Sequence, residues 1–133
     1  MHLKGRVINP GYAKGEAFVL DVPFSFIGDL DGETGRFSVV GHPMFGEILA
    51  DKILVCPTGK GGTIAPYIAY RAWKNGKAPA AILCDEIEPI LCECALAIGI
   101  PLLVSSDQSF VNTIQTGQSV TVSGDEVSVE PQR

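Results

Sequence analysis

The first 56 residues carry short runs of β-branched and aromatic side chains, separated by glycine and proline. Such runs, with turn-forming residues between them, predict β-strands. The last run is apolar throughout from position 53 to 56, which is typical of a strand covered on both faces. The expected strands span residues 3–8, 16–20, 36–40 and 52–56, with a polar turn at 29–35.

Beyond residue 63 the apolar positions change to a helical spacing. Apolar residues from Ile64 to Ala72 recur three and four positions apart, and Asn75-Gly76 gives this helix a C-terminal stop. The elements expected next are a strand at 80–84, a helix at 88–98 and a strand at 101–104. Strands and helices alternating in this way predict a parallel βαβαβ unit that begins with strand 52–56.

The end of the chain returns to a strict alternation of apolar and polar residues. Segments 119–123 and 126–130 flank a Gly124-Asp125 turn and predict a hairpin with one face open to solvent. The fold class is therefore α/β, with a β-rich layer and a parallel βαβαβ unit. We expect a single domain over residues 1–133, since no repeat or low-complexity segment divides the chain.

Composition narrows the function classes. Hydrophobic residues make up 46% of the chain and charged residues only 19%, which fits a buried sheet, a partner-facing surface, or both. The net charge of −5 and the absence of basic clusters argue against nucleic acid. No stretch reaches the roughly 18–20 uncharged residues of a membrane helix, and the N-terminus lacks the apolar core of a signal peptide. We therefore expect a cytoplasmic protein.

The four cysteines, Cys56, Cys84, Cys92 and Cys94, do not predict a metal site. On the expected helix, Cys92 and Cys94 point about 200° apart and cannot share one metal. Both histidines are remote in sequence, so no zinc pattern forms. We interpret the cysteines as small buried side chains in a reducing compartment, and we expect no cofactor in this chain.

The segment Gly59-Lys60-Gly61-Gly62-Thr63 is the strongest candidate site. It leaves the carboxyl end of a buried strand and opens a helix, where open parallel sheets place their ligands. Its glycines let the backbone approach an anion, while Lys60 adds a charge and Thr63 a hydroxyl. The spacing differs from that of a P-loop. The alternative is a tight turn in which Thr63 is the N-cap of the helix.

Two further groups are candidates for the site. The acidic segment 85–88 follows the next parallel strand, and its carboxylates either orient a substrate, accept a hydrogen bond from the first loop, or simply begin a helix. His42 is a possible acid or base, although a single loop histidine is more often neither. The residues alone reveal no nucleophile–base pair.

Several segments, taken in order, resemble one family. Segments 24–35 (phenylalanine-rich, ending in Gly-Glu-Thr-Gly), 41–43, 55–70, 75–81 and 97–101, together with Gly5-Arg6 and 15–17, are similar to the small subunit of the aconitase X family. The family contains dehydratases of small hydroxy acids such as phosphomevalonate and cis-3-hydroxyproline. The resemblance covers nearly the whole chain.

The resemblance implies a swivelling β/β/α domain, like the mobile C-terminal domain of aconitase. This domain would dock on a large subunit that carries an iron–sulfur cluster and would share with it a site for a small anionic hydroxy acid. The family's loop supplies a serine as base, and Gly62 stands at that position here. We therefore expect Thr63 to be the catalytic residue and Gly59, Lys60, Gly61 and Gly62 to bind substrate. The alternative is a non-catalytic swivelling or scaffold domain that binds a partner or a small anion through the same loop.

Overall fold

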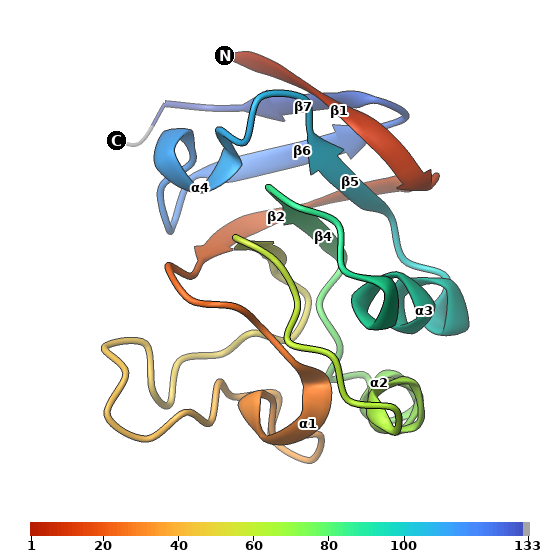
Figure 1. Cartoon of the computed structure of the whole chain (residues 1–133). Coiled ribbons are helices and arrows are strands. Elements are labelled where there is room, and N and C mark those ends of the chain that lie inside the picture. Colours follow the sequence, from red (N-terminus) through yellow and green to blue (C-terminus); the bar gives the residue numbers. More distant parts are fainter. Residues whose placement is uncertain (132–133) are drawn as a thin grey trace.

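The computed structural model describes residues 1–131 (Figure 1). Seven strands and four helices are present in this part of the chain. In chain order they are β1 (His2–Asn9), β2 (Tyr12–Val19), α1 (Phe26–Asp29), β3 (Ile53–Cys56), α2 (Ala65–Lys74), β4 (Ala81–Cys84), α3 (Pro89–Ile98), β5 (Leu102–Ser105), α4 (Phe110–Thr113), β6 (Ser119–Ser123) and β7 (Glu126–Val129).

The strands close into one barrel in the order β1-β5-β4-β3-β2-β6-β7. The pairs β2–β3, β3–β4 and β4–β5 are parallel, which confirms the expected βαβαβ unit. The other pairs are antiparallel, including the β6–β7 hairpin. The β-rich part and the parallel unit are thus joined edge to edge, since β2 pairs with β3 and β1 pairs with β5.

Alternate residues of the parallel strands serve two different cores. In β3, Ile53 and Val55 belong to the cluster inside the barrel, together with Phe110 of α4. Leu54 and Cys56 belong to the larger cluster under α2 and α3. Because successive side chains of a strand point to opposite faces, a strand covered on both faces must be apolar throughout, as this run is. Helices α2 and α3 cover the outer face of the parallel strands, on the side away from the hairpin (Figure 1).

The predicted strand at 36–40 is wrong. This segment makes only isolated bridges, Leu30 with Phe37 and Arg36 with Ile48. Phe37 is buried, which explains the strand-like pattern, but its neighbours hydrogen-bond within a long connection and not along a sheet edge. A buried aromatic anchor in a loop produces the same local pattern as a strand residue. The strand predicted at 16–20 exists, but it begins four residues earlier, at Tyr12.

Within residues 1–131 no helix is long and apolar enough to cross a membrane.

Candidate functional site

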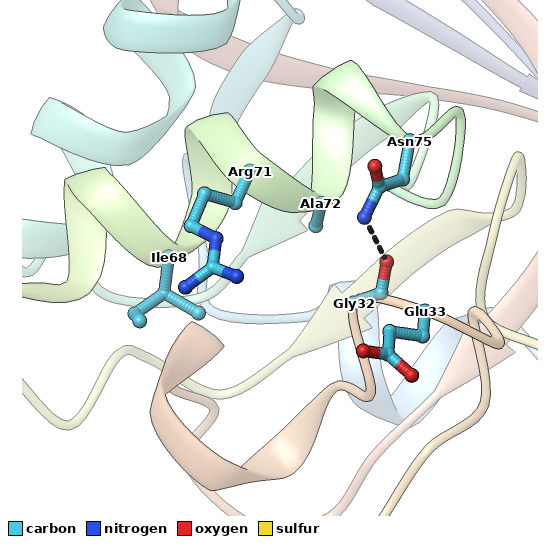
Figure 2. A pocket seen from close by; sticks show the side chains of 6 residues that line it. All are labelled: Gly32, Glu33, Ile68, Arg71, Ala72 and Asn75. Carbon is cyan, nitrogen blue, oxygen red and sulfur yellow. Dashed lines mark hydrogen bonds between the residues drawn. The ribbon is translucent and has the colours of Figure 1, made fainter.

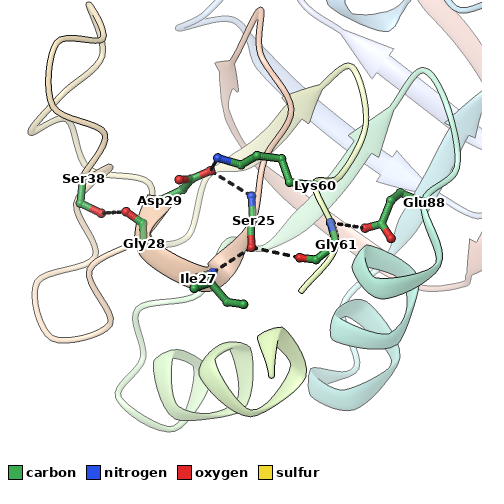
Figure 3. A network of polar contacts seen from close by, with 8 residues as sticks. All are labelled: Ser25, Ile27, Gly28, Asp29, Ser38, Lys60, Gly61 and Glu88. Carbon is green, nitrogen blue, oxygen red and sulfur yellow. Dashed lines mark hydrogen bonds and ion pairs between the residues drawn. The ribbon is translucent and has the colours of Figure 1, made fainter. Parts of the chain in front are cut away.

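The Gly59–Thr63 loop leaves the carboxyl end of β3 and leads into α2, as the sequence predicts. The segment 24–29, which contains α1, runs beside it (Figure 3). Phe24 N–H donates to the Thr58 carbonyl at 3.0 Å, and Lys60 N–H donates to the Phe24 carbonyl at 3.1 Å. The loop therefore has a wall supplied by a stretch of chain more than 30 residues earlier. We call residues 24–29 the wall segment.

An ion pair joins the loop to the wall segment. Lys60 Nζ lies 2.8 Å from Asp29 Oδ2. The Asp29 side chain is only 8% exposed, whereas that of Lys60 is 46% exposed. Asp29 Oδ2 also accepts the Ser25 backbone N–H at 3.0 Å. The carboxylate is thus buried between a backbone donor and the loop lysine, and the lysine reaches from this anchor toward solvent.

Ser25 gives the wall segment its shape. Its Oγ accepts the Ile27 N–H at 3.0 Å, which caps α1, and donates to the Gly61 carbonyl at 3.4 Å. A serine that caps a short helical turn satisfies one of its unpaired N–H groups. The same hydroxyl therefore fixes the turn and touches the loop (Figure 3).

Glu88 holds the loop from the other side. It is the N-cap of α3, where its carboxylate accepts the N–H groups of Ile90 and Leu91 at 2.8 and 3.0 Å. The same carboxylate accepts the Gly61 N–H at 3.2 Å. Two interpretations of segment 85–88, a helix start and a hydrogen bond from the first loop, are therefore both correct for Glu88. Gly59 is necessary here, because a Cβ at that position would collide with Glu88 Oε1.

Gly62 and Thr63 have different surroundings. Gly62 has a φ of +100°, and a Cβ there would lie 2.5 Å from Ile27 Cδ1. A serine at this position therefore requires Ile27 to move and the backbone to adopt a conformation that L-residues rarely adopt. Thr63 is exposed. The N-cap of α2 is Ile64, with no side-chain bond to the helix, so the alternative that Thr63 caps this helix is wrong.

The other sequence candidates are engaged elsewhere. Asp85 accepts the N–H groups of Phe110 and Val111 and so begins α4. Burial, followed by the nearby negative charges, raises the pKa of the Asp85 carboxyl, although its backbone hydrogen bonds oppose the change. His42 contacts Asp21 at 3.2 Å and accepts the Met44 N–H at 3.0 Å. These contacts use both of its ring nitrogens, one within its own loop and one toward the segment that follows β2.

The cysteines do not fit an iron–sulfur cluster. Cys56, Cys84 and Cys94 are buried, and burial raises the pKa of the Cys84 and Cys94 thiols to about 12. Cluster ligands are thiolates, which a low pKa favours. In the described part of the chain, residues 1–131, no three His, Cys, Asp or Glu side chains gather in a way that could hold a metal ion.

Two hollows lie against α2. One, of about 190 Å³, separates α2 from the turn at Gly32 and Glu33, and the Asn75 amide closes one end by donating to the Gly32 carbonyl at 2.9 Å (Figure 2). The other is apolar, with a lining of Pro66, Tyr67, Tyr70 and Ala97. It lies on a row of exposed side chains that begins directly after the loop. We call this row the aromatic stripe; it consists of Ile64, Tyr67, Tyr70 and Trp73.

The fold defines the class of protein. The crystal structure of a 3-isopropylmalate dehydratase from Methanocaldococcus jannaschii matches with a TM-score of 0.58 at 13% identity, over 92% of this chain and 84% of that one. At such low identity the likeness is one of fold alone. The class that follows is therefore one of fold: the chain shares the α/β fold of that dehydratase chain.

The particular family follows from closer relatives. Residues 2–130 match the aconitase X swivel domain. The phosphomevalonate dehydratase small subunit of Thermococcus gammatolerans is 42% identical over 130 residues, covering 98% of this chain and 97% of that one. The crystal structure of Thermococcus kodakaraensis aconitase X in its holo-form matches with a TM-score of 0.89 at 39% identity, over 98% and 99% of the two chains. The chain belongs to the aconitase X swivel domain family, which confirms the resemblance seen in its sequence.

The sequence predicted the Gly59–Thr63 loop as the candidate site but did not predict the role of the wall segment. Segment 24–35 carries the family resemblance, yet nothing in its pattern assigns Asp29 to the site. One signal was available: Asp29 is a single carboxylate within the otherwise uncharged stretch from Phe24 to Leu30. A lone charge in such surroundings needs a partner of opposite sign. Which lysine supplies it is a matter of tertiary structure.

Proposed function

We propose that this chain is the small subunit of a two-subunit hydro-lyase that removes water from a small anionic hydroxy acid, at a site completed by a large subunit. The observation that carries the proposal is the full-length match to dehydratase small subunits, with 98% of this chain and 97% of a relative covered. The position of the Gly59–Thr63 loop supports it, because the loop lies at the sheet edge where ligands bind. Phosphomevalonate, named for the relatives, and cis-3-hydroxyproline are the first substrates to test.

In such a dehydration a base removes a proton from the carbon next to the one that carries the hydroxyl. The electron pair of that C–H bond forms the carbon–carbon double bond as the C–O bond breaks. In our proposal the departing hydroxide takes up a proton from an acid of the large subunit and leaves as water. In our proposal Thr63 takes the proton, because it is the exposed hydroxyl in the loop. Gly59, Gly61 and Gly62 shape the backbone around the substrate, and Lys60 donates to it. Activation of Thr63 has to come from the partner, since no base in residues 1–131 contacts its hydroxyl.

We place the iron–sulfur cluster in the large subunit, because the cysteines of this chain do not fit one. The aromatic stripe supports a partner that covers the loop from the α2 side. Tyr67 is 75% exposed, and Tyr70 and Trp73 are nearly half exposed. Exposed aromatic side chains in a contiguous row are typical of protein interfaces. We further propose that the complex works in the cytoplasm.

The alternative function is a non-catalytic swivelling or scaffold domain that binds a partner or a small anion through the same loop. The geometry at Gly62 favours this alternative, because the position offers no hydroxyl and Ile27 occupies the space beside it. The two functions differ in one measurable respect: only the first requires the complex to release water from a substrate.

Co-expression with a large aconitase X-type subunit tests the proposal. The purified complex is incubated with phosphomevalonate, cis-3-hydroxyproline and related hydroxy acids, and the unsaturated product is measured. We expect one of these acids to lose water in the complex and none with either subunit alone. A stable, cluster-loaded complex that dehydrates none of them would favour the scaffold function.

The role of the aromatic stripe is tested by exchanging tyrosines. Tyr67→Ser with Tyr70→Ser should weaken association with the large subunit by at least ~30-fold, since interface aromatics often contribute about 2 kcal/mol each. Tyr12→Ser is the matched control, because Tyr12 is 68% exposed but lies on β2, outside the stripe. Equal affinities for both variants, measured by sedimentation or calorimetry, would place the interface elsewhere.

A further inference from the structure

Two donors that the sequence assigns to the substrate already have partners within the chain. Lys60 Nζ is held by Asp29 at 2.8 Å, and the Gly61 N–H is held by Glu88 at 3.2 Å. Neither carboxylate belongs to the loop: one comes from the wall segment and the other from the start of α3 (Figure 3). The loop is therefore clamped between two carboxylates.

The fold explains why a carboxylate is present at Glu88 but does not explain why one is present at Asp29. Glu88 caps α3, and a helix of this length needs such a cap whether or not the loop binds anything. Asp29 accepts one backbone N–H, from Ser25, and otherwise faces Lys60. A buried carboxylate is unfavourable unless a cation or several donors compensate it. A neutral residue would have met the needs of the turn, so the charge of Asp29 has to be explained by Lys60.

We propose that Asp29 is a positioning residue for Lys60, which it fixes in place and whose charge it balances. This inference rests on the proposed function, in which the loop faces the substrate. An ammonium group has three donors. One is directed to Asp29, and the others remain available because the Lys60 side chain is 46% exposed. Lys60 thus meets the substrate as an oriented hydrogen-bond donor and not as a free cation.

Charge balance has a consequence for selectivity. A free lysine attracts any anion, including phosphate and the carboxylates of unrelated metabolites. A lysine paired with aspartate keeps its donors but loses most of this long-range attraction, because the two charges cancel at a distance. The loop then selects a ligand that fits its geometry, and most of the attraction for the anionic group of the substrate has to come from outside this loop.

The first experiment uses the chain alone, with inorganic phosphate as the probe and the backbone amide NMR signals of Gly62 and Thr63 as the readout. Asp29→Asn should tighten phosphate binding by about fivefold, the effect of one unit charge at about 4 Å in water. The double variant Asp29→Asn with Lys60→Gln should return to the affinity of Lys60→Gln alone. Glu33→Gln is the matched control, because it removes one charge from an exposed residue four positions along. Equal tightening by both single variants, or none by Asp29→Asn, would overturn the proposal.

The second experiment uses the reconstituted complex. Asp29→Asn should lower kcat by about tenfold, because the donor is no longer oriented, while KM does not rise. Combining it with Lys60→Gln should add nothing to the effect of Lys60→Gln. A wild-type kcat in Asp29→Asn would overturn the positioning role. If the complex dehydrates none of the tested acids, the proposed function fails. The phosphate titration of the chain alone still shows whether Asp29 balances the charge of Lys60.

A measurement on the unmodified chain removes any dependence on how the variants fold. In ¹⁵N spectra of the lysine ammonium groups, the Lys60 signal should be protected from exchange by its bond to Asp29. Lys14, exposed on β2, provides the unpaired reference. Equal exchange at the two lysines would show that the ion pair is not maintained in solution and would overturn the proposal.

Discussion

The loops after β3 and β4 occupy equivalent places, at the carboxyl ends of neighbouring parallel strands, but they use their polar groups differently. After β4, Asp85 and Glu88 direct their oxygens to the backbone N–H groups that begin α4 and α3. After β3, the Thr63 side chain is exposed, and Lys60, although it pairs with Asp29, keeps 46% of its side chain exposed. The edge of a parallel sheet therefore only marks where a ligand can bind. A loop can become a site when the fold leaves some of its polar groups accessible to a ligand.

The largest expected effect concerns Thr63. Thr63→Ala should lower turnover of the reconstituted complex by about 10²-fold or more, because the variant lacks the group that accepts the proton from the substrate. Thermal stability should hardly change, since Thr63 is exposed and does not cap α2. Thr63→Ser keeps a hydroxyl and should retain most of the turnover. Unchanged turnover in Thr63→Ala would assign the base to the large subunit.

Glu88 caps α3 and also contacts the Gly59–Thr63 loop, so its removal should affect both stability and activity. Glu88→Ala should lower the free energy of unfolding by about 1–2 kcal/mol, because α3 loses its cap. It should also loosen the Gly59–Thr63 loop, which raises hydrogen exchange at Gly61 and lowers turnover. Glu88→Gln keeps an acceptor and serves as the control. If Glu88→Ala loses stability but keeps its turnover per folded molecule, the contact between Glu88 and the Gly59–Thr63 loop does not matter for activity.

Placing a serine at position 62, as the family resemblance implies for relatives, should not increase turnover. Gly62→Ser should cost about 1–2 kcal/mol of stability, because a non-glycine residue is placed at a φ of +100° and close to Ile27. Adding Ile27→Ala should recover the steric part of this cost and leave the backbone part. Chemical denaturation of the single and double variants measures both parts. A stable Gly62→Ser variant with increased turnover would contradict this account.

The smallest effect is the pH dependence that comes from Asp85. Burial raises its pKa in the folded state above the ordinary value of 3.8. The folded state then binds more protons than the unfolded state between the two pKa values, so stability falls as pH rises through this window. Asp85→Asn removes this group and should flatten the stability curve just above pH 4. Denaturation midpoints from pH 3 to 6 check the difference, with Asp125→Asn, in the exposed β6–β7 turn, as the control.

The pattern of residues predicted the parallel unit well because it depends on local information. Strand β3 is apolar throughout, α2 begins near Pro66, and α3 ends at Gly99 in the left-handed conformation that favours glycine. The false strand at 36–40 shows the limit of such patterns. Phe37 is buried like a strand residue, but its partners are turns and not a neighbouring strand. Burial of one side chain does not reveal what its backbone pairs with.

By itself, the sequence determined the α/β class, the order of elements in the parallel unit and the hairpin, the family, and the loop at which chemistry is expected. These depend on residue spacing and on motifs that can be read in order along the chain. Tertiary structure alone decided that the strands close into a barrel, that Asp29 pairs with Lys60, and that Ile27 occupies the space beside Gly62. Each of these joins segments more than 30 residues apart. An ion pair or a steric contact acts over only a few ångströms, so it exists only once folding has brought its partners together.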